Sequence, residues 1–345
     1  MYDVMVIGAG PAGCITAKRL ADTDYDVLLV ERMKIPREKS CSGILIKKSI
    51  ELIENEFGKI PDSVLCKPNI SKGITITNEK NQTFKFESDS LNVWRSLLDK
   101  WTALKAQNAG AELKQSTSAV ACAEKQGYVS VKLHDGEIYE EKARIVVACD
   151  GAGSAIKKNL FKNPNNYIFT YQTLCRGSID LDNDFFHAFL HPELSQYDAW
   201  FNVKDDFLIF GVGIREPAKM KMYHSKFISF LNLQFNAEIE SCVKGEVGIM
   251  PCVMPGCPVN LGAGRILFAG EAANFLNPIG EGISSALASG RAAAEAIKTA
   301  YKTNNLSVEY LVDTYKRNIS PEKEYMERQW AILANMSSKF SYMKK

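Results

Sequence analysis

Residues 2–31 read YDVMVIGAGPAGCITAKRLADTDYDVLLVE, and this stretch decides the fold. Residues 4–7 and 27–30 are short, continuous apolar runs, as expected for strands of a parallel sheet that is covered on both faces. Between them, residues 11–22 place small and apolar side chains at helical spacing. The sequence therefore predicts a β-α-β unit at the N-terminus.

The turn inside this unit carries a Gly-x-Gly-x-x-Gly pattern. Gly8 allows a tight turn, Gly10 lets the backbone approach a pyrophosphate, and Gly13 lets helix and strand pack closely. The first helical turn, with Pro11 and Ala12, directs free N–H groups and a positive dipole end toward the phosphates. We therefore expect a dinucleotide at this turn.

An acidic residue completes the pattern. Glu31 ends the second strand, where its carboxylate can accept both hydroxyls of an adenosine ribose and would repel a 2′-phosphate. Arg32 follows at the same edge. This favours FAD or NAD over NADP. The alternative is a glycine turn that only packs, and the complete strand, turn, helix and acid argue against it.

A second segment favours FAD over NAD. Gly270 and Glu271 follow the apolar strand 266–269, where a carboxylate could reach a ribityl chain. The helix expected over 283–299 begins at Ile283, after Pro278, Gly280 and Gly282, and its N-terminus can stabilise negative charge on a reduced flavin. The alternative is an ordinary strand–loop–helix with glycine caps.

A third segment follows the apolar strand 145–148. It places Asp150 and Gly151 directly after the strand end. An Asp-Gly pair is also a common turn, so this segment carries weight only together with the other two.

Bulk composition sets the class of protein. The chain has 345 residues, of which 46% are hydrophobic, which suits two domains with buried cores. A net charge of +2 and basic runs no longer than pairs give no footprint for nucleic acid.

The strand signals predict an α/β fold in two parts. Parallel-sheet material occurs at the start, in the middle and near residue 266, whereas residues 167–214 are aromatic-rich with short strand-like segments. We predict a discontinuous Rossmann-like FAD-binding domain with an inserted antiparallel β-sheet substrate domain and a C-terminal helical segment. The FAD-binding domain would span residues 1–68, 92–165 and 250–300, the substrate domain 69–91 and 166–249, and the helical segment 301–345.

Cysteine and histidine usage predicts a cytoplasmic protein without a metal site. The nine cysteines form no Cys-x-x-Cys pair, and none of the four histidines lies at zinc-ligand spacing from a cysteine. Reduced thiols explain this better than disulfides. The N-terminus lacks a signal-peptide pattern, and no apolar run approaches the roughly 20 residues that span a bilayer.

Together, the three motifs resemble the geranylgeranyl reductase family of the FAD-dependent p-hydroxybenzoate hydroxylase-fold superfamily. Residues 268–283, FAGEAANFLNPIGEGI, resemble its flavin-site segment, and residues 39–45, KSCSGIL, resemble its Cys-Gly-Gly loop. Glu271 and residues 200–211, WFNVKDDFLIFG, are most similar to the CbrA-like branch.

The resemblance implies roles for individual residues. Arg95, on a long helix expected over 91–108, would reach the phosphate and ribityl region, and Asp150 would lie nearby. Glu271 would replace the usual aspartate at the ribityl chain. Cys41, Ser42 and Gly43 would lie beside the flavin, and Pro278, Gly280, Gly282 and Ile283 would line its ring.

The chain also departs from the family pattern. Ser42 stands where the family has glycine, and the family's Tyr-x-Trp motif is spaced Tyr197-x-x-Trp200. The histidine of the monooxygenases is Asn274 here. These departures concern the substrate rather than the cofactor.

The resemblance implies an FAD-dependent oxidoreductase that reduces a C=C bond of a hydrophobic, isoprenoid-like substrate by hydride transfer from flavin N5. Cys41 would donate the proton and Trp200 would act in the pocket. The alternatives are that Cys41 packs a turn, that the aromatic residues are sheet core, and that Glu281 caps a helix rather than serving the flavin.

Two other functions share the fold. One is an FAD-dependent monooxygenase that hydroxylates an aromatic or apolar small molecule, and the other is a flavin-binding redox sensor. No second glycine-turn unit is present, so we expect transient NAD(P)H or a protein electron donor. The C-terminal helix suggests peripheral membrane contact or a cap on the core. Its apolar residues are Trp330, Ile332, Leu333, Met336 and Phe340.

Overall fold

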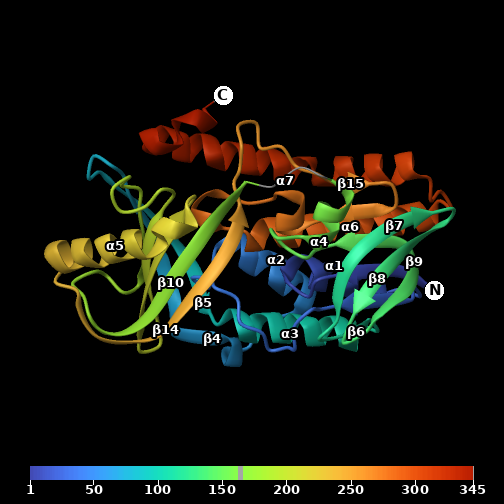
Figure 1. Cartoon of the computed structure of the whole chain (residues 1–345), viewed down its shortest axis with the longest axis horizontal. Helices are drawn as coiled ribbons and strands as arrows, with labels where there is room; N and C mark the ends of the chain where they lie inside the picture. Colours follow the sequence, from blue (N-terminus) through green and yellow to red (C-terminus); the bar gives the residue numbers. More distant parts are fainter. Residues whose placement is uncertain (162–165, 345) are drawn as a thin grey trace.

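The computed structural model describes residues 1–161 and 166–344. Two sheets lie toward opposite ends of the long axis, and helices pack between and above them (Figure 1). The N-terminus lies beside the first sheet, and the long helix α7 (Val308–Met336) runs across the top of the molecule in this view.

The first sheet contains the predicted β-α-β unit. Its order is β15-β16-β9-β1-β2-β6, and the β7–β8 hairpin joins it through β9. Strand β1 pairs in parallel with β2 and β9, and β16 pairs in parallel with β9. The strands are β1 (Tyr2–Ile7), β2 (Val27–Val30), β6 (Glu112–Lys114), β7 (Ser118–Lys125), β8 (Tyr128–His134), β9 (Ile138–Ala148), β15 (Gly262–Ala263) and β16 (Ile266–Phe268).

The second sheet is mostly antiparallel, as predicted, in the order β14-β10-β13-β12-β11-β4-β5-β3. One pairing differs, because β11 and β4 run parallel. The strands are β3 (Ile44–Leu45), β4 (Leu65–Thr77), β5 (Thr83–Val93), β10 (Tyr167–Ser178), β11 (Phe185–Phe189), β12 (Ala199–Lys204), β13 (Phe207–Ile214) and β14 (Glu238–Pro251).

Helices cover both sheets. Helix α1 (Pro11–Ala21) packs against α3 and α6, and α7 packs on α6. Helix α5 (Met220–Phe235) covers the outer face of the second sheet, where Phe227 packs in a second core with Phe201 and Phe210. The others are α2 (Lys47–Phe57), α3 (Arg95–Asn108), α4 (Ala155–Leu160) and α6 (Ile283–Lys302), with 3-10 turns η1 (Asp62–Val64), η2 (Pro217–Lys219), η3 (Gly270–Ala273), η4 (Pro278–Gly280) and η5 (Ser338–Met343).

Two sequence-based expectations need correction. The helix predicted from residue 91 begins at Arg95, because residues 91–93 pair as the end of β5. Not all cysteines are free thiols: Cys175 and Cys242 lie opposite each other on β10 and β14 and form a disulfide. They are 67 residues apart, so spacing along the sequence could not reveal the pair.

The C-terminal helix follows one of its two predicted alternatives, the cap on the core. Trp330, Leu333 and Phe340 are buried, and the Trp330 indole donates a hydrogen bond to the Leu276 carbonyl at 2.9 Å. Only Ile332 among the five apolar residues is strongly exposed, so this helix caps the core instead of presenting an apolar face. No helix in the described part of the chain combines the length and apolar character needed to cross a bilayer.

Three glycines let α1 sit in backbone contact with its neighbours. A Cβ on Gly13 would overlap the Gly8 carbonyl at the end of β1, and a Cβ on Gly290 would overlap the Ala12 carbonyl. Gly8 itself has φ +100° and faces the backbone of residue 149. Thr16 bridges the α1–α6 contact, because its hydroxyl lies 3.0 Å from the Gly290 carbonyl. The start of α1 is therefore set against both β1 and α6.

We predict that Gly290→Ala destabilises the protein by about 1–3 kcal/mol, the usual cost of forcing one extra carbon into a packed interior. Urea unfolding measures this loss, and the midpoint should fall while the slope stays constant. Arg291→Ala is the matched control, because Arg291 is exposed on the same helix. Equal stability of the two variants would contradict the close contact.

Candidate active site

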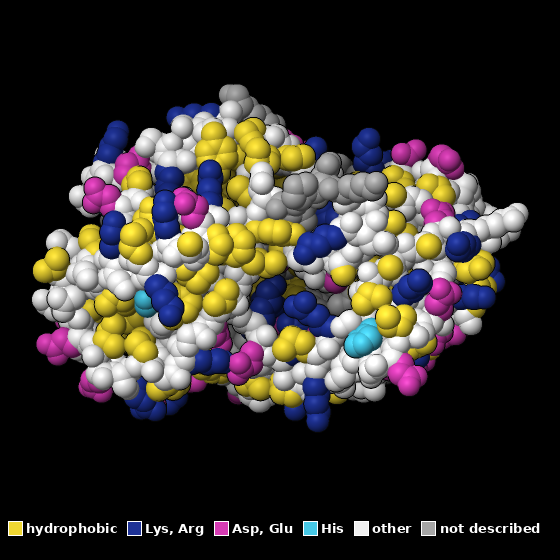
Figure 2. Space-filling model, viewed as in Figure 1, with side chains coloured by type: hydrophobic (Ala, Val, Ile, Leu, Met, Phe, Trp, Pro, Cys, Tyr) yellow, Lys and Arg dark blue, Asp and Glu magenta, His cyan; other side chains and the backbone are white. Residues whose placement is uncertain are grey.

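A cleft of about 1270 Å³ lies between the two sheets. Figure 2 shows a hollow between the two halves of the molecule, with Lys and Arg side chains on its wall. The three sequence motifs meet here because parallel strands share one carboxyl edge: Ile7 and Phe268 each lie beside Ala148 in the sheet register. The residues that follow these strand ends therefore line the same cleft.

The start of α1 presents unpaired backbone donors to the cleft. Gly10 is the N-cap, and no side chain caps the helix. Gly10, Pro11 and Ala12 line the cleft, and a Cβ on Gly10 would meet only the Arg37 guanidinium. Such an uncapped helix start fits a phosphate group. Gly13 lies beneath and serves packing.

Glu31 is fixed at the edge of this site. Its carboxylate accepts the Ala9 N–H at 2.9 Å and the Met33 N–H at 3.0 Å, and Arg37 lies 3.3 Å away. The side chain is buried to 4% exposure but still lines the cleft, as does the neighbouring Arg32.

Asp150 leaves one carboxylate oxygen without a partner. Its Oδ2 accepts the Ala155 N–H at 2.9 Å, whereas the buried Oδ1 accepts no hydrogen bond. Burial raises the pKa of this carboxyl above its usual range. Gly151, with φ +79°, turns the chain beside it. An unpaired polar oxygen in a cleft is expected to bind a ligand hydroxyl or amide.

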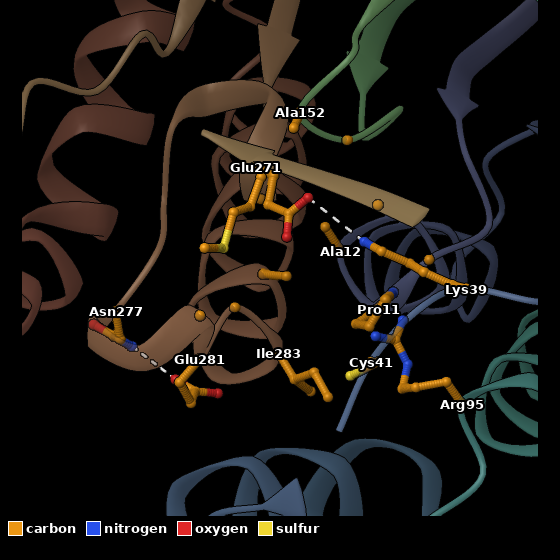
Figure 3. Close-up of a pocket in the computed structure, with 18 of the residues that line it drawn as sticks. Pro11, Ala12, Lys39, Cys41, Arg95, Ala152, Glu271, Asn277, Glu281 and Ile283 are labelled. Carbon is orange, nitrogen blue, oxygen red and sulfur yellow. Dashed lines mark hydrogen bonds and ion pairs between the residues drawn. The ribbon is translucent and has the colours of Figure 1, made fainter. Parts of the chain in front are cut away.

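Glu271 extends across the cleft toward Lys39. The Glu271 and Lys39 side chains point at each other and their charged atoms are 3.5 Å apart (Figure 3). Gly270 has φ +63°, which allows the turn that brings Glu271 into the cleft. Pro278, Gly280, Gly282 and Ile283 form the wall on the same side.

Glu281 acts as a helix cap. Its carboxylate accepts the Ser284 N–H at 2.9 Å and is bonded by the Asn277 amide at 2.8 Å, as Figure 3 shows for Asn277. These contacts support the capping interpretation of the sequence.

Cys41 lies beside the guanidinium of Arg95 (Figure 3). Arg95 is buried and forms an ion pair with Asp99 at 3.0 Å, and Asp99 also contacts Arg37 at 3.2 Å. Cys41 and Ser42 line the cleft, whereas Gly43, with φ +77°, packs against the Val93 carbonyl. Burial of Cys41 opposes ionisation, but Arg95 and Lys204 outweigh it and lower the pKa of the thiol.

The second sheet supplies an apolar lobe of the cleft. Trp200 lies flat over Gly211 of the neighbouring strand, where a Cβ would overlap the indole. Asp198 lies over Gly213 in the same way, is 2% exposed, and has an oxygen without a hydrogen-bond partner. Tyr197, in contrast, packs against Phe340 in the core, so the residue that shares the lobe with Trp200 is Asp198.

The structure brings together nearly all of the predicted site residues, since only Gly13 and Gly43 lie behind the cleft wall. Four others were missed: Arg37, Asp99, Asp198 and Lys204. Their contacts join segments distant in sequence. The only available signal was the alternation of Asp198 with Trp200 and Lys204, which places all three on one strand face. No cluster suited to a metal ion occurs within residues 1–161 and 166–344.

Comparison with known proteins agrees with this geometry. Residues 1–166 match the FAD binding domain family. Digeranylgeranylglycerophospholipid reductase 1 of Methanopyrus kandleri is 29% identical over 90% of this chain and 84% of its own length. The corresponding reductase of Methanosarcina acetivorans is 28% identical over 92% of this chain and 80% of its own.

The chain is an FAD-dependent relative of the geranylgeranyl reductases. Its assignment to the CbrA-like branch stays a prediction.

Two solved structures share the fold of this chain. A geranylgeranyl bacteriochlorophyll reductase-like protein from Thermoplasma acidophilum has a TM-score of 0.81 and 24% identity, covering 95% of this chain and 84% of its own. A myxobacterial chondrochloren halogenase has a TM-score of 0.75 and 16% identity, covering 100% and 86%. At these identities the likeness establishes the fold alone.

We predict that Glu31→Gln weakens FAD binding about tenfold, because a neutral amide is a poorer acceptor than a carboxylate and leaves Arg37 without a full partner. FAD titration of the apoprotein by flavin fluorescence measures the affinity. Glu112→Gln is the control, since Glu112 is exposed on β6 outside the cleft. Equal losses in both variants would contradict a role for Glu31 in the site.

Asp198 should destabilise the protein in a pH-dependent way. Burial raises the pKa of Asp198 to about 6, with Lys339 as the nearest compensating charge. The cost is absent below about pH 4, where the carboxyl is protonated both folded and unfolded, and complete above pH 6. Asp198→Asn should therefore raise the free energy of unfolding at pH 7 by about 1–3 kcal/mol, and by less at pH 5. Urea unfolding at both pH values tests this, and an equal gain at both would contradict it.

Proposed function

We propose that this chain saturates carbon–carbon double bonds of an isoprenoid lipid with electrons from FAD. One observation carries the proposal: the cleft lined by the glycine-rich strand ends is also lined by apolar side chains of the second sheet, and Cys41 and Arg95 lie in its wall. Ile44 and Ile46, which follow Cys41 in the sequence, are among the apolar residues that line the cleft.

The residues present fit FAD. The uncapped start of α1 suits the pyrophosphate, and the fixed carboxylate of Glu31 suits the adenosine ribose. The unpaired oxygen of Asp150 and the carboxylate of Glu271 would hold the ribityl chain. Gly280 and Gly282 leave space for the ring at the start of α6. When bound and reduced by its electron donor, FAD would supply the hydride that saturation of an alkene needs.

We propose that Cys41 donates the proton. Saturating an isolated alkene requires a proton on the carbon that does not receive the hydride, and the donor must face the cleft. Cys41 does so, and Arg95 stabilises the negative charge that proton loss leaves on sulfur. Asp99 holds Arg95 in place.

The lobe fits a long hydrocarbon chain. Phe86 and Ile332 in its lining are exposed, at 42% and 47%, whereas Phe186 and Trp200 in the same lining are buried. The remaining lining is mainly aliphatic: Ile74, Ile76, Met250, Leu333 and Met336. The curated relatives are named as reductases of a digeranylgeranyl lipid, which agrees with such a pocket.

The sequence contains no second glycine-turn unit of the α1 type that could bind the dinucleotide of an electron donor. We therefore propose a donor that binds transiently, either NAD(P)H or a protein.

The decisive experiment compares two fates of the reduced enzyme. The holoenzyme is reduced without oxygen and mixed either with a geranylgeranyl lipid or with O2 and a phenol. The proposal expects stoichiometric flavin reoxidation by the lipid and a saturated product. A hydroxylated product with O2, or no reaction with either, would favour the monooxygenase or the redox sensor.

Cys41→Ser should slow lipid reduction at least about 100-fold, the lower range for loss of a proton donor, while FAD stays bound. Stopped-flow flavin absorbance measures the rate, and the visible spectrum measures FAD content. Cys252→Ser is the matched control, because Cys252 is also a free, half-buried thiol but lies outside the cleft lining. An unchanged rate in Cys41→Ser would remove Cys41 from the reaction.

A further inference from the structure

Side chains of strand β12 contact the backbone of the Cys41 loop, residues 41–43. Side chains of residues 198–204 alternate along this strand, so Asn202 and Lys204 share the face of Trp200. The Asn202 amide donates to the Ser42 carbonyl at 3.2 Å, and Lys204 Nζ lies 3.4 Å from the Cys41 carbonyl. Lys204 thus lies directly beneath the loop that carries the thiol.

Lys204 is a buried cation without a carboxylate partner. It is 2% exposed, donates to the Val93 carbonyl at 3.0 Å and lies 4.7 Å from the centre of the Trp94 ring. Within the described residues it forms no ion pair with an aspartate or glutamate. Burying an ion costs several kcal/mol unless an opposite charge lies close by. An anion is therefore expected beside it.

The buried acidic and basic side chains near Lys204 do not balance its positive charge. A chain of buried ion pairs runs from Glu31 to Arg37 at 3.3 Å, from Arg37 to Asp99 at 3.2 Å, and from Asp99 to Arg95 at 3.0 Å. These are two carboxylates and two guanidinium groups, which balance. Lys204 adds a positive charge that nothing in this chain of ion pairs neutralises.

Two other acidic groups near Lys204 do not fill this place. Glu246 is paired with Lys244 at 2.9 Å on β14. Burial raises the pKa of the Cys66 thiol to about 12, so that thiol is neutral.

We propose that Lys204, together with Arg95, stabilises the thiolate form of Cys41, so that the sulfur carries the missing negative charge once Cys41 has given up its proton. Lys204 is then a positioning residue: it fixes the loop through the Cys41 carbonyl and sets the charge on the sulfur. The Gly43 N–H, 3.4 Å from Sγ, supports the same state. Arg95 and Lys204 outweigh the effect of burial and lower the pKa of Cys41. Burial lowers the pKa of Lys204, and the negative charge on Cys41 opposes that shift.

The consequence for turnover rests on the proposed function. When Cys41 gives its proton to the alkene carbon, the S–H bond breaks, a C–H bond forms and the electron pair stays on sulfur. Lys204 and Arg95 stabilise that anion, so Cys41 is a stronger acid than an ordinary thiol. Solvent restores the proton before the next turnover. The charge on Cys41 can be measured without turnover, so the two proposals fail separately.

The test is the pH dependence of Cys41 alkylation in the FAD-loaded enzyme. Iodoacetamide reacts with the thiolate, and mass spectrometry follows the Cys41 peptide between pH 5 and 10. We expect a midpoint at least one unit below the roughly 8.5 of an unperturbed thiol. Lys204→Met should move the midpoint up by at least one unit and slow alkylation at pH 7 about tenfold. Lys204→Arg should keep the low midpoint.

Two controls separate charge from structure. Asn202→Ala removes the Ser42 contact but no charge, so the Cys41 midpoint should stay. Cys252, whose pKa burial raises, serves as an internal reference in every digest and should not respond to Lys204→Met. A wild-type midpoint near 8.5 or above overturns the proposal even if Lys204→Met does not fold. An unmoved midpoint in folded Lys204→Met overturns it as well.

Discussion

Helix α1 is held in backbone contact between strand β1 and helix α6, and the cleft depends on that contact. The missing side chains of Gly13 and Gly290 allow it, because a Cβ at either position would overlap a carbonyl group of the neighbouring segment. The contact places the uncapped start of α1 at the sheet edge where Asp150 and Glu271 follow their strands. A looser contact would separate the phosphate-binding donors from the carboxylates on the same edge.

Buried charge is the second organising feature. The ion pairs from Glu31 through Arg37 and Asp99 to Arg95 connect the end of β2 with the Cys41 thiol. Such pairs seldom add net stability, because desolvation offsets their attraction. Their value here is positional: each side chain is held by two partners and cannot turn away from the cleft. Asp198 in the cleft wall is likewise buried, without a full set of hydrogen-bond partners.

Features set by local pattern were predictable. The β-α-β unit and the second antiparallel sheet follow from apolar runs and short strand-like segments in the sequence. Errors arose where a distant partner decided. Residues 91–93 belong to a strand because β3 and β4 pair with them. The Cys175–Cys242 disulfide depends on the register of β10 and β14.

The sequence by itself determined the cofactor class and predicted most of the positions that meet in the cleft, since the glycines and acids act through backbone geometry at strand ends. It also set Cys41 and Trp200 apart as candidates. Only the tertiary structure decided which charges surround that thiol. Arg37, Asp99 and Lys204 lie on three separate segments, and their side chains meet only when the first sheet, α3 and β12 pack together. Electrostatic effects on a buried group depend on distances in space, which sequence separation does not encode.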